Sequence, residues 1–276
     1  TTKYDYNLSK NIINIQKLNI NNYERTFKQT GLDDSFLRYA NTMEKLSDYE
    51  MKANFKLGKM NTIGGFELSD PSFNNDRVNG RTYSRRTRSI FIQNDFKHSD
   101  NHKIITGFRY DQYGSTHVYS PRFAYLFEYS ENMRLRFSSG TGFRIPSFLE
   151  LYIDFYNVDN GYIVKGNRFL EPEKSLGSTV NLEYLNEKIR VNVLAYQNRF
   201  QNKIFSTYKD TTSVITFYEY KNIAKARFQG LELFLDYLAN RVTSFKLNVN
   251  LRNAIDGEWD PIENVIPYSA GTRFSR

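Results

Sequence analysis

The sequence predicts an all-β protein built as an antiparallel meander of long strands. Three observations support this fold class: apolar residues recur with a period of two, short and long connections alternate, and aromatic residues are abundant. The 276 residues include 21 Tyr and 22 Phe, and 16% of all residues are aromatic. No apolar run approaches the roughly 18 residues that a spanning helix needs, so a helical membrane protein is excluded.

The period of two recurs in strand after strand. Apolar residues of each expected strand fall on one face, and polar or charged residues fall on the other. In chain order, the clearest expected strands cover residues 51–57, 121–129, 133–138, 189–196 and 244–252. In the last of these, Leu247 and Val249 flank Asn248. Helical spacing of apolar residues is weak and is limited to residues 36–46 and 148–155, which we expect inside loops.

The connections between these strands alternate in length. Short turns are expected at residues 58–61, 99–101, 130–131, 186–187 and 239–241. Longer or flexible connections are expected at residues 28–47, 70–84, 143–175 and 253–266, with shorter members of this set at 114–117 and 209–213. Such alternation is typical of an up-and-down meander, which places the two sets on opposite sides of the sheet. We count about 13 strands, many long enough for the roughly 9 to 11 tilted residues that cross a bilayer.

Two architectures produce such a meander, and the alternation alone does not separate them. In a soluble β-sandwich the apolar faces meet inside, whereas in a membrane barrel they face lipid and the polar faces enclose water or a plug. Strand length, long loops on one side and aromatic residues near strand ends favour the barrel. Tyr125, Phe127 and Tyr129 approach a short turn, whereas Tyr110 and Tyr113 lie near the opposite rim. The prediction is therefore a partial antiparallel up-and-down transmembrane β-barrel, with short periplasmic turns and long extracellular loops.

Composition and motifs exclude several classes of function. The chain has no Cys, so thiolate metal sites, iron–sulfur clusters, thiol catalysis and disulfide scaffolds are excluded. The formal net charge is +8, but basic residues alternate along strands and form no run beyond Arg85-Arg86, so we expect no nucleic-acid partner. The sequence lacks a nucleophile elbow, a glycine-rich phosphate loop and a His-Glu-x-x-His motif, so we expect no enzyme. The carboxylates of Glu171 and Glu173 lie beside Lys174 and are interpreted as solvated.

Several segments carry a family resemblance in a fixed order. They are Ile90-Phe-Ile-Gln-Asn-Asp-Phe96, Gly107-Phe-Arg-Tyr-Asp111, Tyr119-Ser-Pro-Arg-Phe-Ala-Tyr-Leu-Phe127, Arg134-Leu-Arg-Phe-Ser-Ser-Gly-Thr-Gly-Phe-Arg-Ile-Pro-Ser-Phe-Leu-Glu-Leu-Tyr152, Gly166-Asn-Arg-Phe-Leu-Glu-Pro-Glu-Lys-Ser175, Tyr196-Gln-Asn-Arg-Phe-Gln-Asn-Lys-Ile204 and Gly230-Leu-Glu232. On these residues the chain resembles the barrel of TonB-dependent outer-membrane receptors, over about residues 48–276. Each segment alone is a weak signal, but their shared order is specific.

The resemblance implies a barrel of about 22 strands, filled by a plug domain and surrounded by outer-membrane lipid. Such a receptor imports a scarce, bulky nutrient, and the TonB-ExbB-ExbD complex drives transport through the plug. The sequence shows neither a plug nor a TonB box, and it stops within an expected strand. We therefore expect residues 1–276 to be a single domain, about 13 of those strands, without the plug domain and the terminal strands.

Basic residues alternate with the apolar residues of the expected strands, and we expect them to face the lumen and the plug. These lumen-facing candidates are Lys52, Lys56, Arg109, Arg122, Arg134, Arg136, Arg190, Lys246 and Arg252. A wide barrel encloses more space than side chains fill, and charged groups can hold a plug through wet contacts that rearrange. An apolar lumen would lock the plug in place.

The longest outer loop, from about residue 142 to 174, supplies most candidate ligand-binding residues. The candidates are Arg144, Tyr152, Tyr156, Tyr162 and Arg168, together with His117 from another outer connection. Phe143-Arg144-Ile145-Pro146 and Asn167-Arg168-Phe169-Leu170 resemble, with changes, two boxes of the family's haem receptors. The His that ligates iron between those boxes is missing here, which argues against that mode of haem capture. Residues 162–175 are also similar to a stretch of the cobalamin receptors.

We predict an outer-membrane receptor that imports an iron–siderophore complex, or a related ligand such as cobalamin or haem, with energy from the TonB complex. The sequence predicts no resident cofactor and no metal site, since His98 and His102 flank a short turn without a third ligand. Two alternatives remain open. One is a passive porin-like channel, and the other is a soluble secreted β-sandwich binding module.

Overall fold

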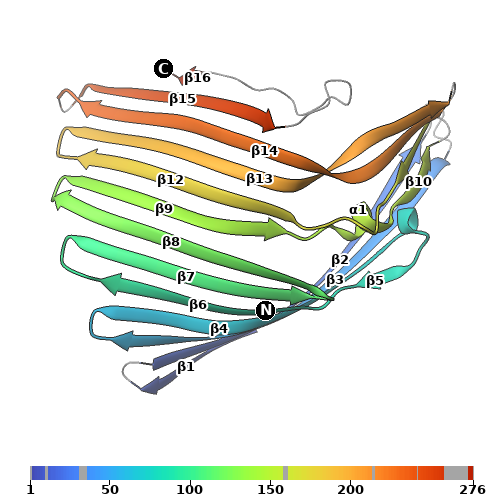
Figure 1. The fold of residues 1–276 in the computed structure, drawn as a ribbon, viewed down its shortest axis with the longest axis horizontal. Helices are drawn as coiled ribbons and strands as arrows, with labels where there is room; N and C mark the ends of the chain where they lie inside the picture. Colours follow the sequence, from blue (N-terminus) through green and yellow to red (C-terminus); the bar gives the residue numbers. More distant parts are fainter. Residues whose placement is uncertain are drawn as a thin grey trace.

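A computed structural model describes residues 2–9, 12–30, 36–157, 161–212, 215–240, 242–257 and 273–275, and the chain is almost wholly β (Figure 1). The strands are β1 (Thr2–Ser9), β2 (Ile12–Thr30), β3 (Phe36–Leu57), β4 (Met60–Asn75), β5 (Thr82–Ser84), β6 (Thr87–Lys97), β7 (His102–Tyr113), β8 (Thr116–Ser130), β9 (Met133–Arg144), β10 (Asp154–Asn157), β11 (Tyr162–Lys165), β12 (Glu173–Leu185), β13 (Ile189–Thr212), β14 (Ile215–Leu238), β15 (Ser244–Gly257) and β16 (Arg273–Ser275). The helical segments are the 3-10 turn η1 (Asp76–Val78) and α1 (Phe148–Tyr152).

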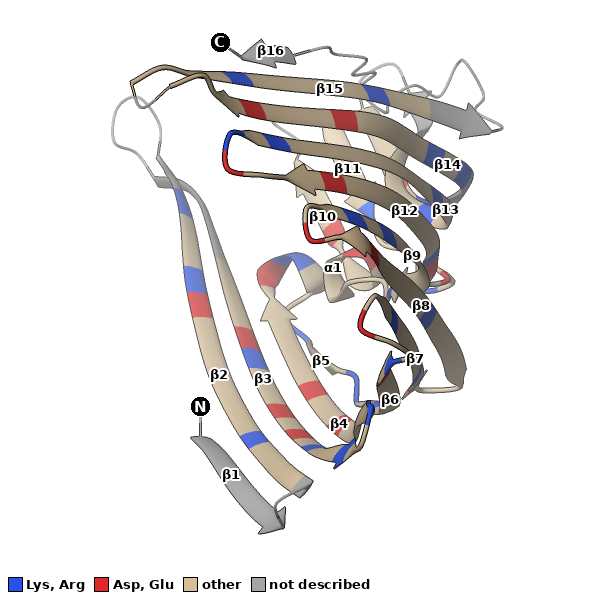
Figure 2. Cartoon of the chain, turned by 90° about the vertical axis from the view of Figure 1, so that its left-hand side faces the viewer, with Lys and Arg blue, Asp and Glu red and all other residues tan. Residues whose placement is uncertain are grey.

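All strands belong to one 16-stranded sheet whose long members pair in chain order. Its path runs β1-β2-β3-β4-β6-β7-β8-β9-β12-β13-β14, and β15 and β16 continue it beyond β14. The long neighbours are antiparallel, and β11 pairs parallel to the start of β14. This arrangement confirms the predicted up-and-down meander and partial barrel. Figure 2 shows the sheet bent into an open curve, with α1 on its concave side. The strands β11 and β10 continue the sheet from the start of β14.

The register separates the two faces as the period of two predicts. On one face Val180 of β12 lies opposite Phe137 of β9, while on the other Asn181 lies opposite Arg136. A shift of one residue would exchange the two faces of a strand, so the apolar pattern fixes the register. We call the apolar side the outer face and the polar side the inner face.

The outer face has no second layer of described residues covering it. Ile90 is 63% exposed, Tyr119 61% and Phe245 60%. Large apolar side chains in this number need an apolar partner, which lipid provides around a barrel. The apolar rows do not meet each other across a dry interior, so the structure argues against a β-sandwich. None of the helices in the described ranges combines the length and hydropathy needed to traverse a bilayer.

The short turns fall where the sequence places them. For example, β3 ends at Leu57 and β4 begins at Met60, and β12 ends at Leu185 before β13 begins at Ile189. The predicted loop over residues 28–47 is wrong, because β2 extends to Thr30 and β3 begins at Phe36. The antiparallel pairing of β2 with β3 continues as far as Thr30 and Phe36. These mostly polar residues therefore form a strand pair, although their sequence shows no alternation of apolar and polar residues.

Other connections also contain more regular structure than predicted. The connection expected at 209–213 is wrong in position, because β13 continues to Thr212. Residues 36–46, which we expected inside a loop, belong to β3. Residues 148–152 lie in the long connection as expected and form α1 there. Most of the connection expected at 253–266 lies outside the described residues, and β15 extends to Gly257.

The buried apolar residues gather mainly at the end of the sheet that carries the long connections. We call the structure there the cap, formed by η1, β5 and the described residues of 145–172, and we call the long strands the strand wall. Val78 of η1 is fully buried, and Phe73 of β4 stacks on Phe148 of α1 with ring centroids 5.9 Å apart. Ile153, Ile163 and Leu170 complete this small core within the cap. The strand wall positions the cap over the inner face.

Candidate ligand-binding cap and inner-face charges

The cap begins with a short helix whose first turn is closed by its own side chains. Ser147 is the N-cap of α1: its Oγ accepts a hydrogen bond of 3.2 Å from the Glu150 backbone N–H. In return, the Ser147 backbone N–H donates to Glu150 Oε2 at 2.7 Å. This capping box gives a hydrogen-bond acceptor to two backbone N–H groups, those of Ser147 and Glu150, which have no partner within the helix.

Arg144, the last residue of β9, ties this helix to the strand wall. Its guanidinium donates to both carboxylate oxygens of Glu150, at 2.9 and 3.0 Å, and to Glu173 Oε1 at 2.7 Å. Glu173 is 8% exposed, and its Oε1 also accepts from the Ile204 backbone N–H at 2.8 Å. Burial would raise the pKa of Glu150, but the hydrogen bonds from Arg144 and Ser147 outweigh it and lower that pKa. Two carboxylates therefore share one arginine at the base of the cap.

A second arginine fixes the cap from the side of β5. Arg85 Nη1 donates to the carbonyl oxygen of Pro146 at 2.8 Å, and its Cζ lies 5.0 Å from the centroid of the Phe148 ring. Burial is the largest influence on Arg85 and lowers its pKa, which still leaves the guanidinium charged at neutral pH. The arginine thus bridges the backbone before α1 and the aromatic core beneath it.

An aromatic stack lies at the C-terminal end of α1. Tyr152 at the end of α1 and Tyr83 of β5 stack with ring centroids 3.9 Å apart and an angle of 7°. Arg168 Cζ lies 5.4 Å from the Tyr152 centroid. Beside it, Phe169 is 92% exposed. A guanidinium next to exposed aromatic surface suits an anionic ligand with flat or aromatic groups.

The β10–β11 hairpin carries a second group of aromatic and charged residues. Lys165 Nζ donates to Asp154 Oδ1 and Tyr156 Oη, and it lies 4.3 Å from the Tyr156 ring centroid. Burial opposes the charge of Lys165, but these hydrogen bonds outweigh it and raise the pKa of the amine. Tyr162 lies edge-on to Tyr218 of β14, with centroids 6.4 Å apart.

The structure places four of the six predicted ligand-binding residues in the cap and a fifth, Arg144, at its base. Arg144, Tyr152 and Arg168 surround α1, while Tyr156 and Tyr162 lie on the β10–β11 hairpin. His117 is the exception: its Nδ1 lies 2.7 Å from Tyr110 Oη, and both residues belong to the outer face. Its position is apart from the other five.

The sequence reasoning missed the residues that hold the cap together. Glu173 was interpreted as solvated, and the structure contradicts this, because the carboxylate is buried against Arg144. Arg85, Glu150 and Lys165 were not candidates. Ser147 followed three residues later by Glu150 is a capping-box pattern, so the sequence did contain a signal for that pair.

All nine predicted lumen-facing cations lie on the inner face by register. Five form ion pairs along it: Arg109 with Glu67 and Asp111, Arg136 with Glu183, Arg134 with Glu128, Lys52 with Glu50, and Lys246 with Asp236. The N–O separations are 2.9 Å in the Arg109 and Arg136 pairs and 3.9 Å between Lys246 and Asp236. No described residue forms an ion pair with the other four, which are Lys56, Arg122, Arg190 and Arg252. Within the described ranges, no group of three or more His, Asp or Glu side chains is arranged to hold a metal ion.

A single curved sheet with an exposed apolar outer face, a charged inner face and a cap over one end defines an outer-membrane β-barrel. The chain belongs to the family described as TonB dependent receptor-like, beta-barrel, whose match covers residues 1–275. Members of this family are transport receptors, and the protein is an outer-membrane protein.

Curated relatives and solved structures agree with this assignment. The chain is 25% identical over 199 residues to the "Iron-regulated outer membrane virulence protein" of Vibrio cholerae, covering 66% of this chain and 30% of the relative. It is 23% identical over 188 residues to "Vitamin B12 transporter BtuB" of Photobacterium profundum, covering 67% of this chain and 28% of that relative. The chain thus spans under a third of the length of these curated relatives.

Two solved structures share the fold at low sequence identity. "Copper transporter OprC" has a TM-score of 0.76 at 12% identity, covering 91% of this chain and 45% of the other. A ferric enterobactin receptor (PfeA) mutant from Pseudomonas aeruginosa has a TM-score of 0.72 at 16% identity, covering 88% of this chain and 41% of the other. At these identities the likeness supports the fold alone.

Proposed function

We propose that this chain is part of a receptor that captures an iron–siderophore complex at the outer surface and imports it with energy from TonB. The observation that carries the proposal is the cap, where Arg168 lies against the Tyr152–Tyr83 stack beside the exposed Phe169. Ferric complexes of catecholate siderophores are anionic and aromatic, so both a guanidinium and stacked rings complement them. The curated relative named for iron regulation is consistent with this cargo.

The inner face supports a mechanism in which a plug fills the lumen. We propose that residues 1–276 form one domain of a larger barrel, and that the inner-face cations contact a plug domain. Lys56, Arg122, Arg190 and Arg252 keep donors available for carboxylates and carbonyls of such a plug, because no described residue forms an ion pair with them. Wet, polar contacts exchange partners with water at low cost. When TonB-ExbB-ExbD pulls on the plug, these contacts could therefore break and re-form.

Ligand titration of the intact receptor tests the cargo. Purified receptor in detergent is titrated calorimetrically with a ferric tris-catecholate, a ferric hydroxamate, haem and cyanocobalamin. We expect the ferric tris-catecholate to bind, and we expect the double variant Arg168→Gln, Tyr152→Leu to bind it about thirtyfold more weakly. The matched control is Arg86→Gln, since Arg86 is an exposed arginine already paired with Asp70 at 2.8 Å. Unchanged affinity in the double variant contradicts this use of the cap.

Cobalamin is the second candidate cargo. It is favoured by the relative named as a vitamin B12 transporter and by residues 162–175, which resemble the corresponding stretch of cobalamin receptors. Cyanocobalamin is neutral overall, so its binding should depend on Tyr152 and not on Arg168. Single variants at these two positions therefore distinguish the two cargoes.

Energy dependence separates a receptor from a passive channel. Cells that carry the intact receptor take up radiolabelled ferric chelate before and after collapse of the proton-motive force. We expect uptake to stop, while binding at the cell surface persists. Uptake that continues at the same rate would support the porin-like alternative.

A further inference from the structure

Four basic residues lie side by side on the outer face, at the end of the sheet that carries the cap. They are Lys174 on β12, Arg199 on β13, and Lys225 and Arg227 on β14, and we call them the rim cluster. Gln201 lies opposite both Lys174 and Lys225, and Arg199 lies directly opposite Arg227. Lys174, Arg199 and Lys225 are exposed, and Arg227 is half-buried. These residues share the face that carries the apolar rows, so they point away from the lumen.

The rim cluster lies at the edge of the apolar band. Following β12 from the cluster toward the short turns, Leu176, Val180 and Leu182 occupy the same face. The apolar row continues across the neighbouring strands: Ala195 of β13 lies opposite Val180, and Leu231 of β14 lies opposite Ala195. Ten residues of β12 separate Lys174 from Tyr184. At about 3.3 Å per residue this is about 33 Å along the strand, and a strand tilted by about 40° then spans about 25 Å across the membrane. This matches the apolar band of about 25 Å in outer-membrane barrels, so the cluster lies at headgroup level on the extracellular side.

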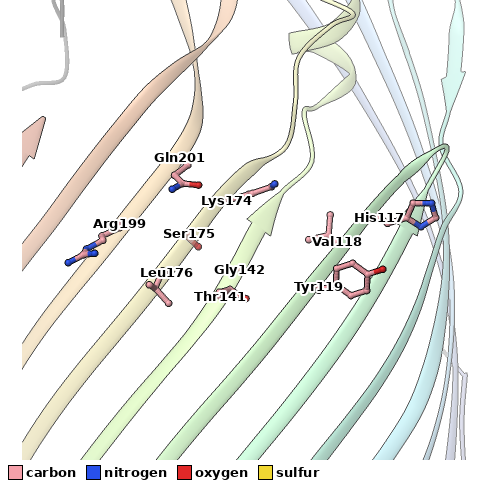
Figure 3. Close-up of a pocket in the computed structure, with 10 residues that line it drawn as sticks. All are labelled: His117, Val118, Tyr119, Thr141, Gly142, Lys174, Ser175, Leu176, Arg199 and Gln201. Carbon is pink, nitrogen blue, oxygen red and sulfur yellow. The ribbon is translucent and has the colours of Figure 1, made fainter. Parts of the chain in front are cut away.

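A cavity adjoins the cluster where two strands of the wall separate. The β8–β9 pairing ends at Arg122 and Gly140, beyond which β9 stays with β12 and β8 stays with β7. The resulting cavity has a volume of about 380 Å³. Figure 3 shows Lys174, Arg199 and Gln201 on one side of it, and His117 and Tyr119 across the gap on β8. The site thus combines cations, an amide and ring edges at one level.

Nothing in the described protein neutralises the rim cluster. None of its four members forms an ion pair with a described residue. Arg199 Nε donates to the neutral Gln197 Oε1 at 2.8 Å. The acidic residues just before Lys174 in the chain are already engaged: Glu173 binds Arg144, and Glu171 accepts from Asn202 Nδ2 at 2.8 Å. Like charges placed directly opposite each other on neighbouring strands destabilise a sheet. An anion from outside the chain would remove this cost.

The cations of the inner face that have no described ion-pair partner are spread over the sheet and do not form a cluster. Its four cations without a described ion-pair partner lie on four different strands: Lys56 on β3, Arg122 on β8, Arg190 on β13 and Arg252 on β15. The rim cluster instead concentrates four cations on three adjacent strands. Concentrated charge at the edge of an apolar band suits a ligand that has both an anionic head and acyl chains.

We propose that the rim cluster binds the phosphate groups of an anionic lipid in the outer leaflet. The guanidinium groups of Arg199 and Arg227 provide paired donors for phosphate oxygens, and Lys174 adds a point charge from the neighbouring strand. The acyl chains of the lipid then lie along the apolar rows that contain Val180 and Leu182. This inference depends on the outer-membrane location and is independent of the imported cargo.

Lipid binding by the intact receptor tests the proposal. The receptor is purified in a neutral maltoside detergent and mixed with lipid A that carries two phosphates, and bound lipid is counted by native mass spectrometry. We expect the triple variant Lys174→Gln, Arg199→Gln, Arg227→Gln to bind about a hundredfold more weakly, or about fivefold for each cation removed. The matched control Arg86→Gln, Lys97→Gln, Lys103→Gln removes the same charge from lysines and arginines that are paired with Asp70, Asp100 and Asp95, and it should bind as the wild type does.

Three outcomes would overturn the proposal. They are equal binding of lipid A without phosphates, undiminished binding by the triple variant, and displacement of the lipid by inorganic phosphate at the same concentration, which would indicate a free-phosphate site. Heat-modifiable migration in SDS verifies that each variant is folded. If the triple variant does not fold, the single variant Arg199→Gln is tested in its place and should bind about fivefold more weakly, and undiminished binding would then reject the inference.

Discussion

In the cap, Val78 is fully buried and Phe73 stacks on Phe148, whereas in the strand wall Ile90 is 63% exposed and lies on a face that no described residue covers. The cap is held by contacts within the chain: a small dry core, a capping box and Arg144 between two carboxylates. The wall has its hydrogen-bonded ladder, but its apolar side chains need a surrounding phase. The difference indicates that the membrane supplies the missing layer of the wall, while the cap keeps its shape in water.

Placing a charge in the middle of the wall should have the largest effect. Val180 lies near the centre of β12 on the outer face, opposite Phe137 and Ala195. Val180→Arg should destabilise the receptor by about 2–4 kcal/mol in lipid vesicles, because a cation near the bilayer midplane loses its hydration. Denaturant unfolding of the vesicle-inserted receptor measures this loss.

The adjacent residue provides the matched control. Thr179 lies on the inner face, where its Oγ1 is 2.6 Å from Ser138 Oγ. Thr179→Arg should cost about 1 kcal/mol, mainly the lost hydrogen bond, because the new charge enters a polar lumen. Equal losses at the two positions would mean that the outer face does not contact hydrocarbon.

A methyl group at Gly166 should disrupt the cap and leave the wall intact. The Gly166 backbone N–H donates to the Ile153 carbonyl at 2.7 Å, and a Cβ there would lie 2.6 Å from backbone atoms of Leu151 and Tyr152. Backbone atoms at this distance must shift, so Gly166→Ala should cost the cap about 1–3 kcal/mol. Hydrogen exchange should accelerate across α1 and β11 while heat-modifiability in SDS is unchanged.

Gly64 is the control for this substitution. It lies in β4 of the strand wall, where the nearest atom to an added Cβ is the Phe91 carbonyl oxygen at 3.7 Å. This is an ordinary contact distance, so Gly64→Ala should leave exchange in the cap unchanged. Faster exchange in the cap of the Gly64 variant would show that the two regions do not respond independently.

The strand wall could be predicted from the sequence, because one face must be apolar and the other polar. The period of two predicted the separation of polar and apolar faces and the approximate positions of the short turns. It could not place the outer hairpin of β2 and β3, whose residues between 19 and 30 are mostly polar and carry no alternating signal. The backbone hydrogen bonds between β2 and β3, and the pairing of β3 with β4, hold these residues in the sheet.

The same alternation near strand ends accounts for the positions of His117 and Glu173. His117 is two residues before Tyr119, so it shares the outer face, although its position along the strand suggested contact with a ligand. Glu173 precedes Lys174 and therefore faces inward, while the lysine faces outward. The tertiary contacts of the cap, such as Arg85 with Pro146, join segments about 60 residues apart and have no local signal.

The contact between cap and wall should respond to pH through Glu150. The Arg144 and Ser147 hydrogen bonds lower the pKa of Glu150 below its ordinary value of 4.5 in the folded state, so the carboxylate stabilises the cap at neutral pH. That contribution is fully present above 4.5 and is lost as the pH falls through the lowered pKa. Arg144→Gln should speed hydrogen exchange of α1 at neutral pH, with a local cost of about 1–3 kcal/mol, and should flatten its acid dependence. Arg86→Gln, which removes an exposed pair with Asp70, should cost less than about 1 kcal/mol and leave that dependence unchanged. A wild-type cap whose exchange is independent of pH down to about 3 would show that the carboxylate does not carry the contact, and the cap would then depend on its aromatic core alone.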